Sequence, residues 1–136
     1  MFARLRKDDD PAGGKSTPGG AVGVDEELEE GGEKVKILCQ TCRFELTTAA
    51  SRITALGAHR HVKVNPHGHV YHIACFHPVP GILPTGVPSG EFSWFSGCRW
   101  QIALCAGCHV HLGWAFSGDA SFTALIEGRF FEESGE

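Results

Sequence analysis

The sequence predicts an all-β domain of antiparallel strands that follows a disordered N-terminal tail. Short stretches in which hydrophobic and polar residues alternate indicate half-buried strands. Clusters of Gly and Pro, which favour turns, separate these stretches at short spacing. The composition also changes near residue 35, where an acidic, glycine-rich segment gives way to an ordinary globular balance. At 136 residues the chain has room for one such domain.

Residues 1–34 are the predicted tail. They carry five Lys/Arg and nine Asp/Glu, a net charge of −4, and are rich in Gly and Pro. Such a segment buries too little apolar surface to offset the entropy of ordering it. Residues 35–136 carry seven residues of each charge and form the predicted domain. A neutral domain lacks the positive electrostatic field that attracts phosphates, so we expect no nucleic acid partner.

Five stretches are predicted strands, at residues 34–39, 61–64, 68–73, 100–104 and 111–116. Alternation places Trp100 and Ile102 on one face of their strand, and Trp114 and Phe116 on one face of theirs. Residues 120–127 could form a last strand or a short helix, because their hydrophobic periodicity does not distinguish the two. Predicted turns and loops lie at 65–68, 78–81, 84–90 and 96–97.

The sequence also bears on the cellular compartment. No segment approaches the roughly 18 apolar residues that a membrane span needs. The N-terminus begins with basic residues but has no apolar stretch behind them, unlike a secretory signal. We therefore expect a cytoplasmic protein with no membrane partner. Six cysteines in a reducing compartment indicate metal binding or catalysis before disulfides.

Two CxxC turns, at residues 39–42 and 105–108, are the most specific motif. Each presents two sulfurs to one ion, and two such turns complete the tetrahedral thiolate shell of a structural zinc at ~2.3 Å per bond. Since 62 residues separate them, they join distant segments and form no local finger. A redox pair would need a βαβ context that is absent here. His109 is a less favoured ligand. The predicted ligands of one structural Zn²⁺ are Cys39, Cys42, Cys105 and Cys108.

The only tryptophans are Trp94, Trp100 and Trp114. One interpretation is that they are core residues at strand spacing. Three converging indoles beside glycine-rich segments also suit a ligand cage. The cage would hold either a planar, weakly polar ring or, with Glu91 as its carboxylate, a quaternary ammonium group.

Four motifs in order resemble a known family. They are Asn65-Pro66-His67-Gly68, residues 89–97 with Trp100, Cys105-Ala106-Gly107-Cys108, and residues 111–116. Over roughly residues 36–130 the chain resembles the thalidomide-binding (CULT) domain of cereblon, which also occurs as a stand-alone bacterial protein. The resemblance implies a β-tent, in which two antiparallel sheets are pinned at one end by zinc.

The resemblance also implies a ligand site. The family binds glutarimides, including thalidomide-type drugs, and related cyclic imides and uracil-like rings. The three tryptophans would form the walls of the cage and Phe116 its floor, while backbone groups around Phe92 and Trp94 would bond the imide edge. The ligand-binding residues implied are Asn65, Pro66, His67, Phe92, Ser93, Trp94, Trp100, Trp114 and Phe116.

The chain departs from the family at two positions. Phe92 stands where animal members have His, and Cys98 takes a place that is usually aromatic. The chain has no room for the Lon-like domain or the ligase-adaptor-binding region of full cereblon. We therefore expect a monomer that binds a small ligand without recruiting a ubiquitin ligase.

Two further hypotheses concern the reaction and the ligand. A methionine sulfoxide reductase-like enzyme of related fold would need a reactive thiol, for which only Cys75 and Cys98 remain, the latter beside Arg99. We favour a protein that is not an enzyme. A peptide ending in a cyclic imide is a candidate physiological ligand for the same cage.

Overall fold

The computed structural model describes residues 23–26 and 35–134. Within these ranges almost every regular element is a strand, and the single 3-10 turn is η3 (Ala49–Ser51). The all-β prediction is therefore confirmed. No helix in the described ranges has the length and apolar character of a membrane span.

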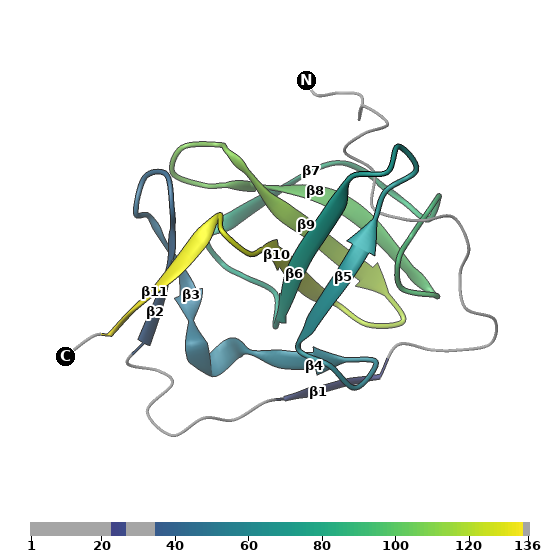
Figure 1. The fold of residues 1–136 in the computed structure, drawn as a ribbon, viewed down its shortest axis with the longest axis horizontal. Helices are drawn as coiled ribbons and strands as arrows, with labels where there is room; N and C mark the ends of the chain where they lie inside the picture. Colours follow the sequence, from purple (N-terminus) through teal and green to yellow (C-terminus); the bar gives the residue numbers. More distant parts are fainter. Residues whose placement is uncertain (1–22, 27–34, 135–136) are drawn as a thin grey trace.

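The larger sheet has six antiparallel strands in the order β5-β6-β10-β9-β8-β7 (Figure 1). Its strands are β5 (Arg60–Val64), β6 (Val70–Phe76), β7 (Ile82–Ser89), β8 (Cys98–Cys105), β9 (His111–Gly118) and β10 (Phe122–Ile126). The predicted strands at 61–64, 68–73, 100–104 and 111–116 are confirmed within it. Residues 120–127 contain the strand β10. Its periodicity was ambiguous because all its residues are buried, so no polar face marks it as a strand.

A second sheet has the order β11-β2-β3. It contains β2 (Val35–Cys39), β3 (Glu45–Thr48) and β11 (Phe130–Ser134). The strand predicted at 34–39 is β2, the central strand, whose last three residues are buried. The sequence analysis missed β3 and β11, since β3 has a single buried residue and β11 has none, and short edge strands of this kind leave only a weak pattern.

A two-stranded ribbon pairs β1 (Val24–Glu26) with β4 (Ile53–Ala55). The prediction of a disordered tail over 1–34 is therefore wrong at these three residues, where pairing with a buried strand orders an otherwise polar segment. Ile53 and Ala55 are fully buried, so β4 belongs to the core and provides the partner edge for β1. Gly23, just before β1, accepts the Leu56 N–H, and the other residues of the predicted tail lie outside the described residues.

The prediction of a loop at 84–90 is wrong in part, because β7 runs through Ser89. Pro84 and Pro88 favoured the loop interpretation, since proline has no N–H to donate to a sheet. However, β7 is the end strand of its sheet, and an edge strand tolerates proline when the missing donor is on its open side. A register shift between Thr85 and Ser89 marks the irregularity.

The six-stranded sheet has a hydrophobic core on each face. We call one face the tryptophan face; its core includes Trp100, Trp114, Phe116 and Phe122. We call the other the metal face, where Leu112 and Leu125 pack against Ile37 and Leu46 of the smaller sheet. The sheet is therefore the central layer, and what covers it differs from face to face.

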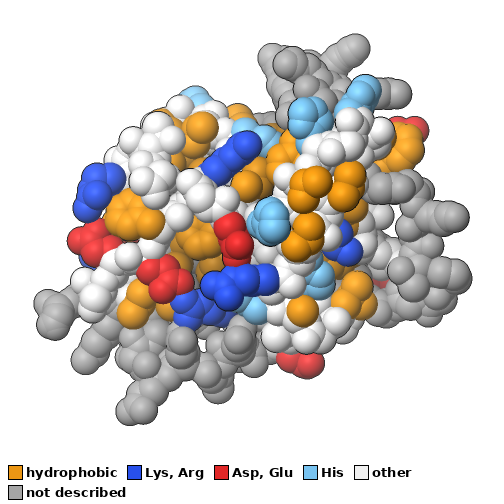
Figure 2. Space-filling model, in the orientation of Figure 1, with side chains coloured by type: hydrophobic (Ala, Val, Ile, Leu, Met, Phe, Trp, Pro, Cys, Tyr) orange, Lys and Arg blue, Asp and Glu red, His pale blue; other side chains and the backbone are white. Residues whose placement is uncertain are grey.

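Over the β5–β6 hairpin the sheet surface remains open, and Figure 2 shows hydrophobic side chains gathered there. Val62 is 59% exposed and Val70 is 56% exposed, and Val64 is also exposed. Val64 faces Val70 across the two strands. The smaller sheet therefore covers only part of the larger one.

Candidate metal centre and aromatic site

The four predicted zinc ligands converge. The Sγ atoms of Cys39, Cys42, Cys105 and Cys108 all lie within 4.8 Å of one another. The Cys39 and Cys108 sulfurs are 3.8 Å apart, and those of Cys42 and Cys105 are 3.6 Å apart. A tetrahedral shell with metal–sulfur bonds of ~2.3 Å places its ligands about 3.8 Å apart. The cluster therefore has the spacing of a four-thiolate metal site, compatible with one zinc ion.

The two CxxC turns have the same backbone conformation. In each, the residue after the second cysteine adopts a left-handed conformation, with φ of 68° at both Arg43 and His109. The N–H of each of these residues donates to the carbonyl of the first cysteine, at 2.8 Å in both turns. This repeated geometry directs both sulfurs of a turn to one point. The His109 ring is not part of the sulfur cluster.

The turns also contact each other directly. Gly107 lies against the Phe44 ring, and a Cβ at that position would come within 2.9 Å of it. The Gly107 N–H donates to the Cys105 sulfur at 3.3 Å. The close approach to Phe44 thus packs the second turn against the segment that follows the first, while the backbone donor stabilises the second turn itself. Figure 1 shows the β2–β3 and β8–β9 connections side by side at one end of the molecule.

The thiols need a cation to ionise together. A backbone N–H at Phe44 lowers the pKa of Cys42, but desolvation and the three neighbouring thiols outweigh it and raise the pKa to about 12. Because a metal binds thiolates, it would displace these protons and relieve the crowding. No coordination position would remain open after four thiolates bind, which is the chemistry of a structural site.

The metal site is built into the hairpin that carries two tryptophans. The second CxxC turn connects the end of β8 to the start of β9, with Trp100 on β8 and Trp114 on β9. Ile102 pairs with Trp114, and Trp100 pairs with Phe116, so all four side chains share one face. The second metal turn and these two strands are therefore parts of one hairpin.

Trp94 reaches the same region from the loop before β8. Its ring meets the Trp114 ring edge-on, with centroids 4.8 Å apart and planes at 77°. Trp114 is fully buried, Trp100 is 2% exposed and Trp94 is 9% exposed. The three indoles thus belong to one cluster on the tryptophan face, and Trp94 is its most accessible member.

Backbone carbonyls orient two of the indoles. The Trp94 Nε1–H donates to the Val64 carbonyl at 3.3 Å, and the Trp100 Nε1–H donates to the Glu91 carbonyl at 2.8 Å. Since both N–H groups are occupied within the protein, these rings would offer a ligand their π faces and edges.

Two loops with predicted ligand-binding residues border this cluster. Asn65 is buried, and its Oδ1 accepts the N–H groups of His67 and His69 at 3.0 and 2.9 Å, which closes the β5–β6 turn. Pro66 and His67 are exposed on that turn. Because Val64 precedes the turn and bonds Trp94, the turn is adjacent to the indoles.

The second loop contains Phe92 and Ser93. Phe92 has a φ of 58°, a left-handed conformation that is costly for an aromatic residue and is often found at binding sites. The Ser93 hydroxyl donates to the Phe95 carbonyl at 3.0 Å and accepts the Phe95 N–H at 3.3 Å. These bonds hold the loop in a tight turn around Trp94.

Phe116 pairs directly with Trp100 across β8 and β9, and its ring packs against two phenylalanines. It stacks on Phe122 with centroids 5.1 Å apart and meets the Phe95 ring edge-on at 5.0 Å. The backbone places Phe116 on the same face as the tryptophans, two residues beyond Trp114 on β9. It supports the loop of Trp94 through Phe95.

Sequence reasoning missed Tyr71 and His111. The Tyr71 ring lies 5.0 Å from Trp114 and 6.1 Å from Trp94. The His111 ring meets Trp114 at 5.1 Å. Burial, then the Arg129 charge, lowers the pKa of His111 to about 4, so this ring is neutral near pH 7. The alternation of Tyr71 with Ile73 and Cys75 along β6 was the available signal for its facing the core.

The two remaining cysteines lie in the core. Burial raises the pKa of Cys75 to about 12, and burial also raises the pKa of Cys98. The Cys98 thiol donates to the Ala120 carbonyl at 3.7 Å. A nucleophilic cysteine needs a lowered pKa and access to substrate, so these environments do not favour redox catalysis.

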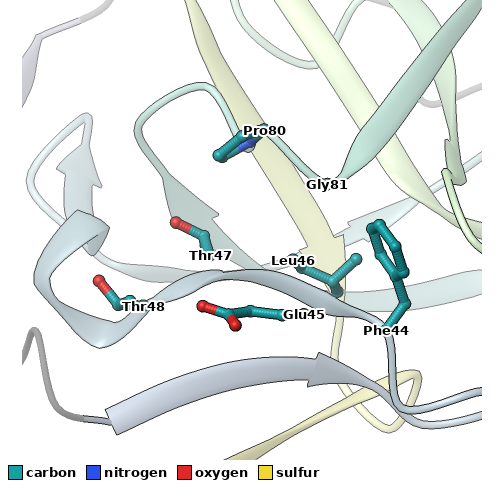
Figure 3. A pocket seen from close by; sticks show the side chains of 7 residues that line it. All are labelled: Phe44, Glu45, Leu46, Thr47, Thr48, Pro80 and Gly81. Atoms are coloured by element: carbon teal, nitrogen blue, oxygen red, sulfur yellow. The ribbon is translucent and has the colours of Figure 1, made fainter.

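A separate pocket of about 380 Å³ lies along β3 and the loop before β7. Figure 3 shows the Pro80–Gly81 backbone passing beside this strand, with Phe44 at one end. The Gly81 N–H donates to the Leu46 carbonyl at 3.0 Å, and a Cβ on Gly81 would come within 2.6 Å of the Leu46 Cα. The pocket borders the metal-face core and is distinct from the tryptophan cluster.

Several curated relatives share this sequence pattern. The chain is 34% identical to "Protein cereblon" of Danio rerio over 83 residues, which is 60% of this chain and 19% of the relative. It is 31% identical to that of Gallus gallus over 93 residues, or 67% of this chain and 21% of the relative. The chain carries a cereblon-like (CULT) domain. With the Drosophila simulans protein, the identity is 32% over 107 residues, 76% of this chain and 18% of the relative.

The cereblon-like chain spans about a fifth of the length of these relatives. No family model matches it. The likeness therefore concerns one part of cereblon, and it agrees with the resemblance found in the four motifs.

Proposed function

We propose that this cereblon-like domain is a non-enzymatic binding module that holds a cyclic imide or a uracil-like ring between Trp94, Trp100 and Trp114. The arrangement of the indoles carries the proposal. Two of them are oriented by backbone carbonyls, the third is fixed on a central strand, and the loops at 65–69 and 90–97 border them. Flat aromatic walls suit a flat neutral ring.

The imide class is supported by the resemblance and by the loop around Phe92. A glutarimide or a thalidomide-type compound has an acceptor, a donor and an acceptor along one edge. The strained turn at Phe92 is the segment whose backbone groups, around Phe92 and Trp94, would bond this edge. A peptide that ends in a cyclic imide has the same edge and is the physiological ligand we favour.

The proposed role of the metal is structural. We assign Zn²⁺ because four cysteine thiolates in a tetrahedral arrangement are its usual structural ligands. Cys42 and Cys108 are exposed, and Cys39 and Cys105 are buried, so the site also needs its thiols kept reduced. We therefore place the protein in the cytoplasm, where thiols stay reduced. The proposal also takes the protein to be a monomer without a nucleic acid or membrane partner.

Quenching of tryptophan fluorescence tests the proposed function. The titrants are glutarimide, uracil and a peptide carrying trimethyl-lysine. We expect saturable quenching by both ring compounds, its loss in Trp94→Ala, and its retention in the control Phe131→Leu on β11, far from the indoles. Binding of the trimethyl-lysine peptide alone would favour a cation cage, and no response to either ring would overturn the proposal.

A further inference from the structure

Lys63 is a half-buried cation on β5 without an acidic partner. Its Nζ lies 5.3 Å from the centroid of the Phe95 ring, which is fully buried. Four other cations in the described part of the chain pair with carboxylates, namely Lys36 with Glu45, Arg43 with Glu133, Arg52 with Glu132 and Arg60 with Glu127. Arg129 instead donates to the His111 carbonyl, and Arg99 is exposed. No carboxylate in the described ranges pairs with Lys63.

The surroundings of Lys63 do not compensate its charge. His61 is on the same strand and face, and burial, followed by the Lys63 charge, lowers the pKa of His61. Its Nε2 is within 2.9 Å of the Ala55 carbonyl. Burial likewise lowers the pKa of Lys63. A phenyl ring attracts an ammonium only weakly compared with an anion, so the cation remains underpaired.

Lys63 borders the aromatic site on two sides. It pairs with Tyr71 across β5 and β6, so the two side chains share a face, and the Tyr71 ring contacts both Trp94 and Trp114. The next residue, Val64, accepts the Trp94 indole N–H. Phe95, which Lys63 covers, directly follows Trp94. The charge therefore lies at the rim of the tryptophan cluster.

We propose that Lys63 makes this site selective for rings that carry an anionic group. The inference rests on the proposed function, because the tryptophans are what hold the ring. A carboxylate or another oxyanion beside the ring would form a charge-assisted pair with the lysine ammonium in a partly desolvated setting. The same charge repels a quaternary ammonium ligand, so it disfavours the cation-cage interpretation.

Matched ligands that differ only in charge test this inference. The first pair is 3-succinylaminoglutarimide and its methyl ester, which share the ring and the linker. The second pair is uracil and its 6-carboxylate, orotate, which places the charge directly on the ring. Affinities are measured by calorimetry at low ionic strength for wild type, Lys63→Met, Lys63→Arg and the control Lys36→Met, which removes an equal charge from the smaller sheet.

In the wild type we expect at least one acid to bind roughly tenfold more tightly than its neutral partner, an advantage that falls as salt is added. Lys63→Met should reduce this preference to less than about twofold while leaving the neutral ligand's affinity unchanged, which also shows that the variant is folded. Lys63→Arg and Lys36→Met should keep the preference.

The outcomes separate the inference from the proposed function. If neutral rings bind but neither acid binds better, or if Lys63→Met keeps the preference, the inference is wrong and the proposed function stands. If no ring of either charge binds, both are wrong.

Discussion

The two faces of the six-stranded sheet are stabilised in different ways. The metal face is covered by a second sheet, and four cysteines from two distant turns join there within 4.8 Å. The tryptophan face is covered by the β1–β4 ribbon and by two loops, and its indoles donate to one carbonyl at the end of β5 and one in the loop before β8. A rigid element that carries adaptable loops is the usual arrangement at a binding site. In the proposed function, the metal face therefore gives support and the tryptophan face recognises the ligand.

The β8–β9 hairpin connects the two faces. Its turn supplies two of the four sulfurs, and its strands hold Trp100 and Trp114. Loss of the metal should therefore reach the aromatic site through these strands, whereas loss of a loop contact should not reach the metal.

The largest effect is expected from Cys105→Ser. This change removes a buried ligand and leaves three thiolates for the ion, so we expect zinc to be lost together with about 5 kcal/mol or more of stability. Metal content and chemical denaturation measure the two effects. Cys98→Ala, which removes a buried thiol outside the cluster, is the matched control and should keep its zinc. Full zinc retention in Cys105→Ser would contradict the four-sulfur site.

Trp114→Ala should have the next largest effect on stability. This indole is fully buried on a central strand, so its truncation should cost about 3 to 5 kcal/mol. Trp94→Ala on the loop should cost less, roughly 2 kcal/mol, because Trp94 is the most exposed of the three indoles, at 9%, and the loop can adjust. Both should abolish ring binding, while only Trp114→Ala should lower the melting temperature strongly. Equal losses of stability would show that the loop is as rigid as the strand.

Gly113→Ala tests how tightly the hairpin packs on β10. A Cβ at Gly113 would overlap the Ala124 carbonyl, so the strands would have to separate at a cost of about 3 kcal/mol. Gly90→Ala is the control, since its nearest neighbour would be the flexible Arg99 side chain at 3.7 Å. Thermal unfolding compares the two variants, and a Gly113→Ala protein as stable as wild type would argue against this packing.

Protonation of His111 should have the smallest effect on the stability of the fold. Its pKa is about 4 in the folded protein and 6.5 in an ordinary setting, so the unfolded chain takes up the proton at higher pH. The stability from this neutral ring is therefore present above pH 6.5 and is lost as pH falls toward about 4. We expect a loss of about 2 kcal/mol between pH 7 and pH 5. Denaturation curves with zinc in excess should show this loss in wild type and a smaller one in His111→Gln.

The sequence was informative wherever a pattern had a single physical cause. Paired CxxC turns have few uses other than binding a metal, and the alternation around Trp100 and Trp114 required two strands. The conformation of Phe92 and the role of Tyr71 depended on tertiary contacts, which one sequence does not contain. The strand β7 was predicted as a loop because proline is excluded from the centre of a sheet but tolerated at its edge, and the sequence does not show which strands lie at an edge.

Comparing ring binding by metal-loaded and metal-free protein tests the central claim most directly. A strong chelator removes the zinc, and glutarimide quenching of tryptophan fluorescence is followed before and after the metal is restored. We predict that binding disappears with the metal and returns with it, because the second CxxC turn connects the strands of Trp100 and Trp114. Unchanged affinity in the metal-free protein would contradict the account and would show that the aromatic site forms without its metal.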